Sequence, residues 1–220
     1  MSRTLVTELV LATLFTCGVL RLITLLQSVS FAAGYVSLLV ALWLIYFPAW
    51  LLKRRGVEAD FVDLRAASFA KSFLLFCVAS MLVFVPFFGL SHLWMIWVQG
   101  YAGFHFVQVP DFFALLLTQL LLIALPEEYF FRGYFQSTLN KVFAPRWNVL
   151  GVRVGWSWVI TALVFAFAHS VIAVQWWHFA IFFPGLLFGY LRERTGSITA
   201  SVLMHAACNI FSAWIWRCYF

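Results

Sequence analysis

Two adjacent glutamates and an arginine lie in one of the most apolar stretches of the chain, "LPEEYFFRGYF", residues 125–135. A charged side chain at the middle of a membrane helix costs roughly 2.5–3.5 kcal/mol on insertion scales, so it normally faces a protein interior or a water cavity and has a partner. On a helix, Glu128 and Arg132 share one face and can pair. Glu127 is rotated by about 100° from Glu128. We therefore expect Arg132 to orient and neutralise Glu128, and Glu127 to point into a cavity.

Glu127 is the candidate general base. An unpaired carboxylate in a poorly solvated pocket can take a proton and return it, which is what a general base must do. Pro126 directly precedes the two glutamates. A proline removes a backbone hydrogen bond and tends to kink a helix, so we expect a polar pocket to open at the depth of Glu127.

Two later apolar segments carry complementary polar groups. The stretch "LVFAFAHS" contains His169, and "SVLMHAACN" places His205 and Asn209 on one face of a helix. Polar groups on three different apolar helices can converge only inside a helix bundle, which indicates an enzyme active site. Singly, each has a simpler interpretation: a structural Glu–Arg clamp, a packing histidine, or an interhelical amide bond. His178, in "QWWHF", is interpreted as such a packing residue.

The composition indicates an integral membrane protein. Of 220 residues, 65% are hydrophobic and only 10% are charged, which is more apolar side chain than one soluble domain could bury. Apolar runs of about 20 residues, the length of a membrane helix, recur along the chain. The predicted fold is all-α: a polytopic transmembrane bundle of about seven helices with an intramembrane polar site. The expected helices are residues 5–26, 31–52, 68–90, 112–140, 155–172, 176–191 and 198–217.

The domain organisation follows from the position of the polar residues. We predict a single integral membrane domain, residues 1–220, in which residues 1–111 carry no motif and residues 112–217 form the catalytic core. The uncharged segment 91–111 is either an interfacial or re-entrant piece or an ordinary loop. The four cysteines have no metal-binding or redox spacing and are interpreted as small packing residues.

The basic residues predict an orientation in the lipid bilayer. The formal net charge is +6, and the Lys and Arg residues cluster in alternate connections, while the intervening connections contain none. By the positive-inside rule, the N-terminus and the basic connections lie in the cytoplasm. The charge therefore reflects membrane topology and predicts no nucleic-acid partner.

Three motifs resemble those of a known family. The sequence "EEYFFR" is similar to an EExxxR motif, "FAFAH" (165–169) to an FxxxH motif, and "HAACN" (205–209) to an HxxxN motif. Together they resemble the family of intramembrane proteases, often called CPBP or Abi, that includes the CAAX prenyl endopeptidases and the bacteriocin-processing proteins. The motifs occur in the order and spacing of that family, within residues 112–217.

The resemblance implies an intramembrane endopeptidase of the glutamic type. Glu127 with His169 would activate water to attack a peptide bond of a membrane-anchored protein or peptide substrate. Glu128 and Arg132 would hold the arrangement, and His205 with Asn209 would donate hydrogen bonds to the oxyanion.

The resemblance also implies a place and a class of substrate. Bacterial members of similar size mature secreted peptides or remove C-terminal sorting tails, so we expect a bacterial inner (cytoplasmic) membrane protein. The chain is shorter than the prenyl-protein endopeptidases, which argues against a prenylated substrate.

Three alternatives stay open at this point. A glutamate with two histidines is a plausible zinc set, but the chain has no HExxH helix and the Arg132 charge lies close by, so we predict a mechanism without cofactor or metal. A non-catalytic membrane scaffold or bacteriocin-immunity protein would use the same cluster to hold helices together. A proton-coupled carrier would show paired broken helices in two related halves, which the sequence does not indicate.

Overall fold

The computed structural model describes residues 2–63, 65–173 and 176–220 and confirms an all-α architecture. These residues form seven helical segments. The segments are α1 (Ser2–Leu25), α2 (Val36–Arg54), α3 (Ala66–Trp97), a long helix over Phe112–Asn140, α7 (Trp156–Ala173), η5 (Trp176–Ile181) with α8 (Phe182–Thr195), and α9 (Thr199–Arg217). The short turns η1 (Leu26–Ser28) and η2 (Ala33–Tyr35) lie between α1 and α2.

Four helices of the described chain are long and apolar enough to cross a membrane: Arg3–Ser28, Ala33–Arg54, Ala66–Trp97 and Phe112–Asn140. Large apolar side chains cover their outer faces, as expected where lipid replaces water. The fifth expected span corresponds to the shorter apolar helix Trp156–Ile172. The sixth expected span, residues 176–191, corresponds to η5 followed by α8, which has 14 residues. These features identify an integral membrane protein.

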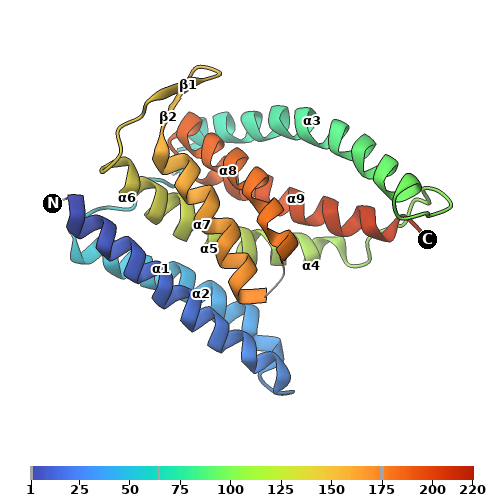
Figure 1. The fold of residues 1–220 in the computed structure, drawn as a ribbon, viewed down its shortest axis with the longest axis horizontal. Helices are drawn as coiled ribbons and strands as arrows, with labels where there is room; N and C mark the ends of the chain where they lie inside the picture. Colours follow the sequence, from blue (N-terminus) through green and yellow to red (C-terminus); the bar gives the residue numbers. More distant parts are fainter. Residues whose placement is uncertain (1, 64, 174–175) are drawn as a thin grey trace.

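The long helix lies in the middle of the bundle (Figure 1). Helices α1 and α2 run side by side at one edge, and α3 lies along the opposite edge against α9. Helix α8 contacts both α7 and α9, and the long helix contacts α2, α7 and α9. The segment that carries the two glutamates is therefore surrounded by the helices that carry the other candidate site residues.

The long helix departs from regular α geometry on both sides of the glutamates. It consists of α4 (Phe112–Leu117), the π-helical η3 (Thr118–Ala124), α5 (Leu125–Glu128), the π-helical η4 (Tyr129–Gln136) and α6 (Ser137–Asn140). Proline cannot donate the backbone hydrogen bond of a regular helix, and π-helical turns are frequent at functional sites. The interruption expected around Pro126 thus takes the form of two π-helical segments that flank the glutamates.

Two details differ from the sequence prediction. Helix α3 continues to Trp97 rather than ending at residue 90, because Met95 and its neighbours pack against the C-terminal residues. His92, in the segment 91–111 that the sequence analysis placed beyond the third helix, lies in α3, and its Nδ1 is 2.7 Å from the Tyr219 hydroxyl. Beyond α3, Phe104 forms an isolated β-bridge with Tyr219. Much of segment 91–111 is therefore built into the bundle.

The connection between the long helix and α7, which is rich in basic residues, contains a β-hairpin that the sequence analysis did not predict. Strands β1 (Trp147–Val149) and β2 (Val152–Val154) are antiparallel, with Trp147 opposite Val154. The two turn residues, Leu150 and Gly151, have φ values of 47° and 81°. Positive φ at both central residues is typical of the tight turns that join antiparallel strands.

The connection between α2 and α3 inserts a phenylalanine against the long helix. Phe61 is buried, its ring centroid lies 5.1 Å from that of Tyr129, and its carbonyl accepts a hydrogen bond from the Ile198 amide. A Cβ atom at Gly133 would lie 2.5 Å from the Phe61 ring. Gly133 therefore allows this connection to pack closely on the helix that carries the glutamates.

This contact makes Gly133→Ala destabilising. Alanine normally stabilises a helix by about 0.5–1 kcal/mol relative to glycine, but overpacking a core typically costs about 1–3 kcal/mol. We expect a lower thermal unfolding temperature for Gly133→Ala in detergent, and partial recovery in the double variant with Phe61→Leu. Gly18→Ala on α1 is the matched control, because a Cβ there meets nothing within 4 Å. Equal stability of the two alanine variants would contradict the packing role of Gly133.

Candidate active site

A fully buried ion pair lies at the centre of the site. Arg132 Nη1 is 2.8 Å from Glu128 Oε1, and neither side chain is exposed. Arg132 Nη2 donates to the Gly185 carbonyl of α8 at 3.0 Å. The guanidinium lies over the Phe165 ring at 4.3 Å and near the Phe188 ring at 5.3 Å. The carboxylate, the carbonyl and the aromatic faces together compensate a charge removed from water.

Glu128 also fixes a histidine from another helix. His205 Nδ1 of α9 is 2.9 Å from Glu128 Oε1. An ionised carboxylate only accepts, so the His205 Nδ1–H is the donor. The imidazole stacks on Phe188 with ring centroids 4.9 Å apart. This orientation directs Nε2 of His205 toward Glu127, 3.8 Å from Oε2.

Glu127 points to the cavity and faces two imidazoles from two other helices. His169 Nε2 of α7 is 3.5 Å from Glu127 Oε2, in addition to the Nε2 of His205. The Phe165 carbonyl accepts a hydrogen bond from His169 Nδ1 at 2.9 Å. In the neutral ring this leaves a lone pair on His169 Nε2, opposite the carboxylate. Two acceptors in this geometry can hold a water molecule by its two hydrogens or share a proton.

Asn209 lies one turn beyond His205 on α9 and has a partner that the sequence analysis did not identify. Its Nδ2 donates to Gln119 Oε1, in η3, at 2.9 Å. An amide nitrogen carries two hydrogens, so one N–H of Asn209 is left for a further acceptor. Gln119 could have been noticed as an isolated polar residue in the apolar run "FALLLTQLLL".

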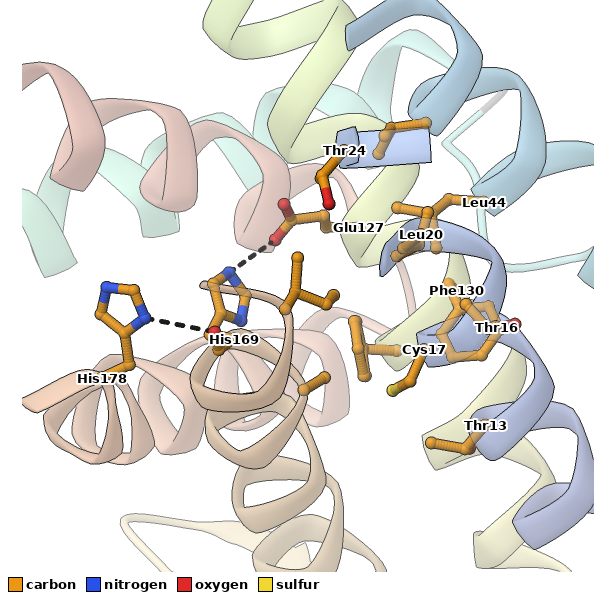
Figure 2. A pocket seen from close by; sticks show the side chains of 14 residues that line it. Thr13, Thr16, Cys17, Leu20, Thr24, Leu44, Glu127, Phe130, His169 and His178 are labelled. Atoms are coloured by element: carbon orange, nitrogen blue, oxygen red, sulfur yellow. Dashed lines mark hydrogen bonds and ion pairs between the residues drawn. The ribbon is translucent and has the colours of Figure 1, made fainter. Parts of the chain in front are cut away.

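Glu127 and His169 open onto a cavity of about 160 Å³ (Figure 2). Its walls come from α1, α2, the long helix and α7. His178 lines it as well, and its Nδ1 lies 3.2 Å from the carbonyl of His169, so this residue packs against the site as the sequence suggested. The contribution of α1 and α2 was not predicted, because residues 1–111 carry no motif.

A metal ion at this site would draw on Glu127, His169 and His205, whose facing atoms converge. Within the part of the chain that the structure describes, no group of three or more His, Cys, Asp or Glu side chains is positioned to hold one. His205 and Glu128 are instead engaged with each other.

The site lies within a segment that matches a known family model. Residues 109–211 match the model described as "Type II CAAX prenyl endopeptidase Rce1-like". The match includes all six predicted site residues, which are Glu127, Glu128, Arg132, His169, His205 and Asn209. No curated protein and no solved structure matches the chain.

The buried ion pair makes Arg132→Ala strongly destabilising. Removing one partner of a buried pair leaves an uncompensated charge and costs about 3–5 kcal/mol. We expect a large fall in the thermal unfolding temperature or loss of folded protein. Arg153→Ala is the matched control, because Arg153 is exposed on β2. Similar stability of the two variants, measured side by side in detergent, would show that the pair contributes nothing to the fold.

Proposed function

Because residues 109–211 belong to the family of Rce1-like type II CAAX prenyl endopeptidases, as the three motifs indicated, we propose that this chain is an intramembrane endopeptidase of the glutamic type. The observation that carries the proposal is the convergence on one carboxylate oxygen. Glu127 Oε2 lies within 4 Å of the Nε2 atoms of both His169 and His205, at the edge of a cavity. The substrate class is a membrane-anchored protein or peptide.

Glu127 and His169 activate the water molecule. The water donates hydrogen bonds to Glu127 Oε2 and His169 Nε2, which are 3.5 Å apart. Glu127 takes a proton as the oxygen attacks the peptide carbonyl carbon, and a tetrahedral oxyanion forms. When the carbon–nitrogen bond breaks, the proton held between Glu127 and His169 passes to the leaving amine.

His205 and Asn209 stabilise the oxyanion. The remaining N–H of Asn209 is a neutral donor. His205 already donates from Nδ1 to Glu128, so a donor at Nε2 requires the imidazolium form. Glu127 balances this charge before it takes the proton, and the oxyanion balances it afterwards. Donors positioned before the reaction stabilise developing charge without reorganisation.

Glu128 and Arg132 are positioning residues. They form the fully buried pair that fixes His205, and Arg132 ties the long helix to α8. We also propose that the chain forms a single membrane domain in a bacterial inner membrane, with its N-terminus in the cytoplasm. The biological role of the protein is then the maturation of a secreted peptide or the removal of a sorting tail.

Glu127→Gln should abolish cleavage without unfolding the protein. The substitution keeps the size of the side chain and removes the base, and a positioned base contributes about 10²–10⁴-fold to a rate. The assay is cleavage of membrane-anchored peptides by purified protein, followed by mass spectrometry, with thermal unfolding checked in parallel. Glu58→Gln is the matched control in an exposed connection.

The outcomes of this assay separate the alternatives. Cleavage by wild type and by Glu58→Gln, with a chelator present, supports the metal-free glutamic mechanism. Retained cleavage by Glu127→Gln contradicts the assignment of the base. Activity that is lost with a chelator and restored by zinc contradicts the metal-free mechanism. Loss of folded Glu127→Gln protein would favour a structural clamp, as in a membrane scaffold.

Asn209→Ala should reduce kcat with little change in KM. Removing one oxyanion donor costs about 10²–10³-fold in rate in comparable sites, because the interaction forms chiefly in the transition state. Steady-state kinetics on a substrate cleaved by wild type would measure this. A change confined to KM would assign Asn209 to ground-state binding instead.

A further inference from the structure

The cavity beside Glu127 is closed on one side by α1, which lies outside the segment 109–211 that matches the family. Thr13, Thr16, Cys17, Leu20 and Thr24 face it from this helix. Their spacing of three and four residues places them on one helix face. Figure 2 shows this row opposite Glu127 and His169, with Thr13 at the end far from Glu127.

The inner face of α1 is held firmly against the motif-bearing helices. Near one end, the Tyr134 hydroxyl donates to Glu8 Oε1 at 3.0 Å, which ties α1 to the long helix. Near the other end, Arg21 Nη1 donates to the Ile172 carbonyl at 2.7 Å, which ties α1 to the last part of α7. Two attachments along one helix fix the distance between its inner face and the reacting groups.

The chemistry of the wall favours an apolar occupant. Cys17 and Leu20 are buried and contribute carbon and sulfur surface. The hydroxyl of Thr16 accepts from Trp43 Nε1, and that of Thr24 donates to the Arg21 carbonyl. The Thr13 hydroxyl, at the end of the cavity far from Glu127, has no partner among the described residues. A polar side chain placed beside Cys17 and Leu20 would lose hydration against apolar surface, which is unfavourable.

The volume limits the occupant to one side chain. A cavity of about 150 Å³ with apolar walls binds a molecule of the size of benzene. The present cavity has about 160 Å³. This size matches a side chain such as leucine or phenylalanine more closely than the larger bicyclic ring of tryptophan.

We propose that this cavity is the specificity subsite of the enzyme, which receives one apolar side chain of the substrate next to the cleaved bond, and that Cys17 and Leu20 of α1 set its size. The inference rests on the proposed function, because it needs Glu127 and His169 to act on the adjacent bond. Helix α1, which carries no motif, then selects the substrate, and the motif-bearing helices carry out the reaction.

Substrate profiles of α1 variants test the proposal. Membrane-anchored peptides that wild type cleaves are prepared with Ala, Leu, Phe or Trp on either side of the cut bond. We expect wild type to prefer Leu or Phe at one position. Leu20→Ala should enlarge the cavity and raise kcat/KM for the Trp peptide relative to the Leu peptide at least tenfold. Cys17→Phe should fill the cavity and raise kcat/KM for the Ala peptide relative to the Leu peptide by a similar factor. Both shifts are expected for pockets that discriminate by size.

Matched controls lie on the outer face of the same helix. Leu22 and Leu14 are 66% and 60% exposed, so Leu22→Ala and Leu14→Phe change the lipid-facing side only. Both controls should keep the wild-type profile. An unchanged profile in both cavity variants, with cleavage retained, would overturn this inference alone. Failure of wild type to cleave any peptide would instead count against the proposed function, and the inference would fall with it.

Cross-linking gives a second test that needs no turnover. Glu127→Gln protein with Cys77, Cys208 and Cys218 replaced by alanine keeps Cys17 as its single thiol. A cleavable peptide that carries a cysteine next to the cut bond is mixed with it and oxidised with copper phenanthroline. We expect a disulfide with Cys17 from that position and none from a cysteine five residues away. Absence of a position-specific cross-link would overturn the placement of the side chain.

Discussion

The site depends on a charge that is completely removed from water. Arg132 and Glu128 are both fully buried, and the guanidinium is also held by the Gly185 carbonyl and the ring faces of Phe165 and Phe188. A buried pair of this kind is not in itself a source of stability, because desolvation opposes the attraction. Its effect is geometric: the arginine can be accommodated only when the long helix, α7 and α8 are all in place. Glu128 then fixes His205 of α9, so one pair determines the relative position of four helical segments.

Two adjacent glutamates of the long helix point to different partners. Glu128 points to Arg132 within the same helix, and Glu127 points to the imidazoles and the cavity. The π-helical segments on either side of α5 carry Gln119, which bonds to Asn209, and Arg132, which pairs with Glu128. A π-helical turn is uncommon because it weakens local packing, and it is retained where side chains must be directed to special places. Here those side chains are the ones that surround the candidate base.

Much of this arrangement could be predicted from the sequence, for identifiable reasons. The i, i+4 spacing of Glu128 and Arg132 is local information, and a charge in an apolar helix requires a partner, so their pairing could be expected and is observed. The convergence of His169 and His205 on Glu127 followed from three polar helices in one bundle. The hairpin at Trp147–Val154 could not be recognised in a basic connection. Likewise, the Gln119–Asn209 bond and the insertion of Phe61 against Gly133 depend on which helix faces meet, and periodicity alone does not determine this.

The proposed separation between reaction and selection agrees with how a membrane enzyme must be built. The groups that perform the chemistry are costly to bury, so they are confined to helices that satisfy one another's charges. Walls that only select by size need no charge, and any apolar helix can provide them. Helix α1 meets this requirement, since Cys17 and Leu20 face the cavity while Glu8 and Arg21 attach the helix at its two ends. A change on its inner face can therefore alter the space beside Glu127 while the buried pair keeps the reacting groups in position.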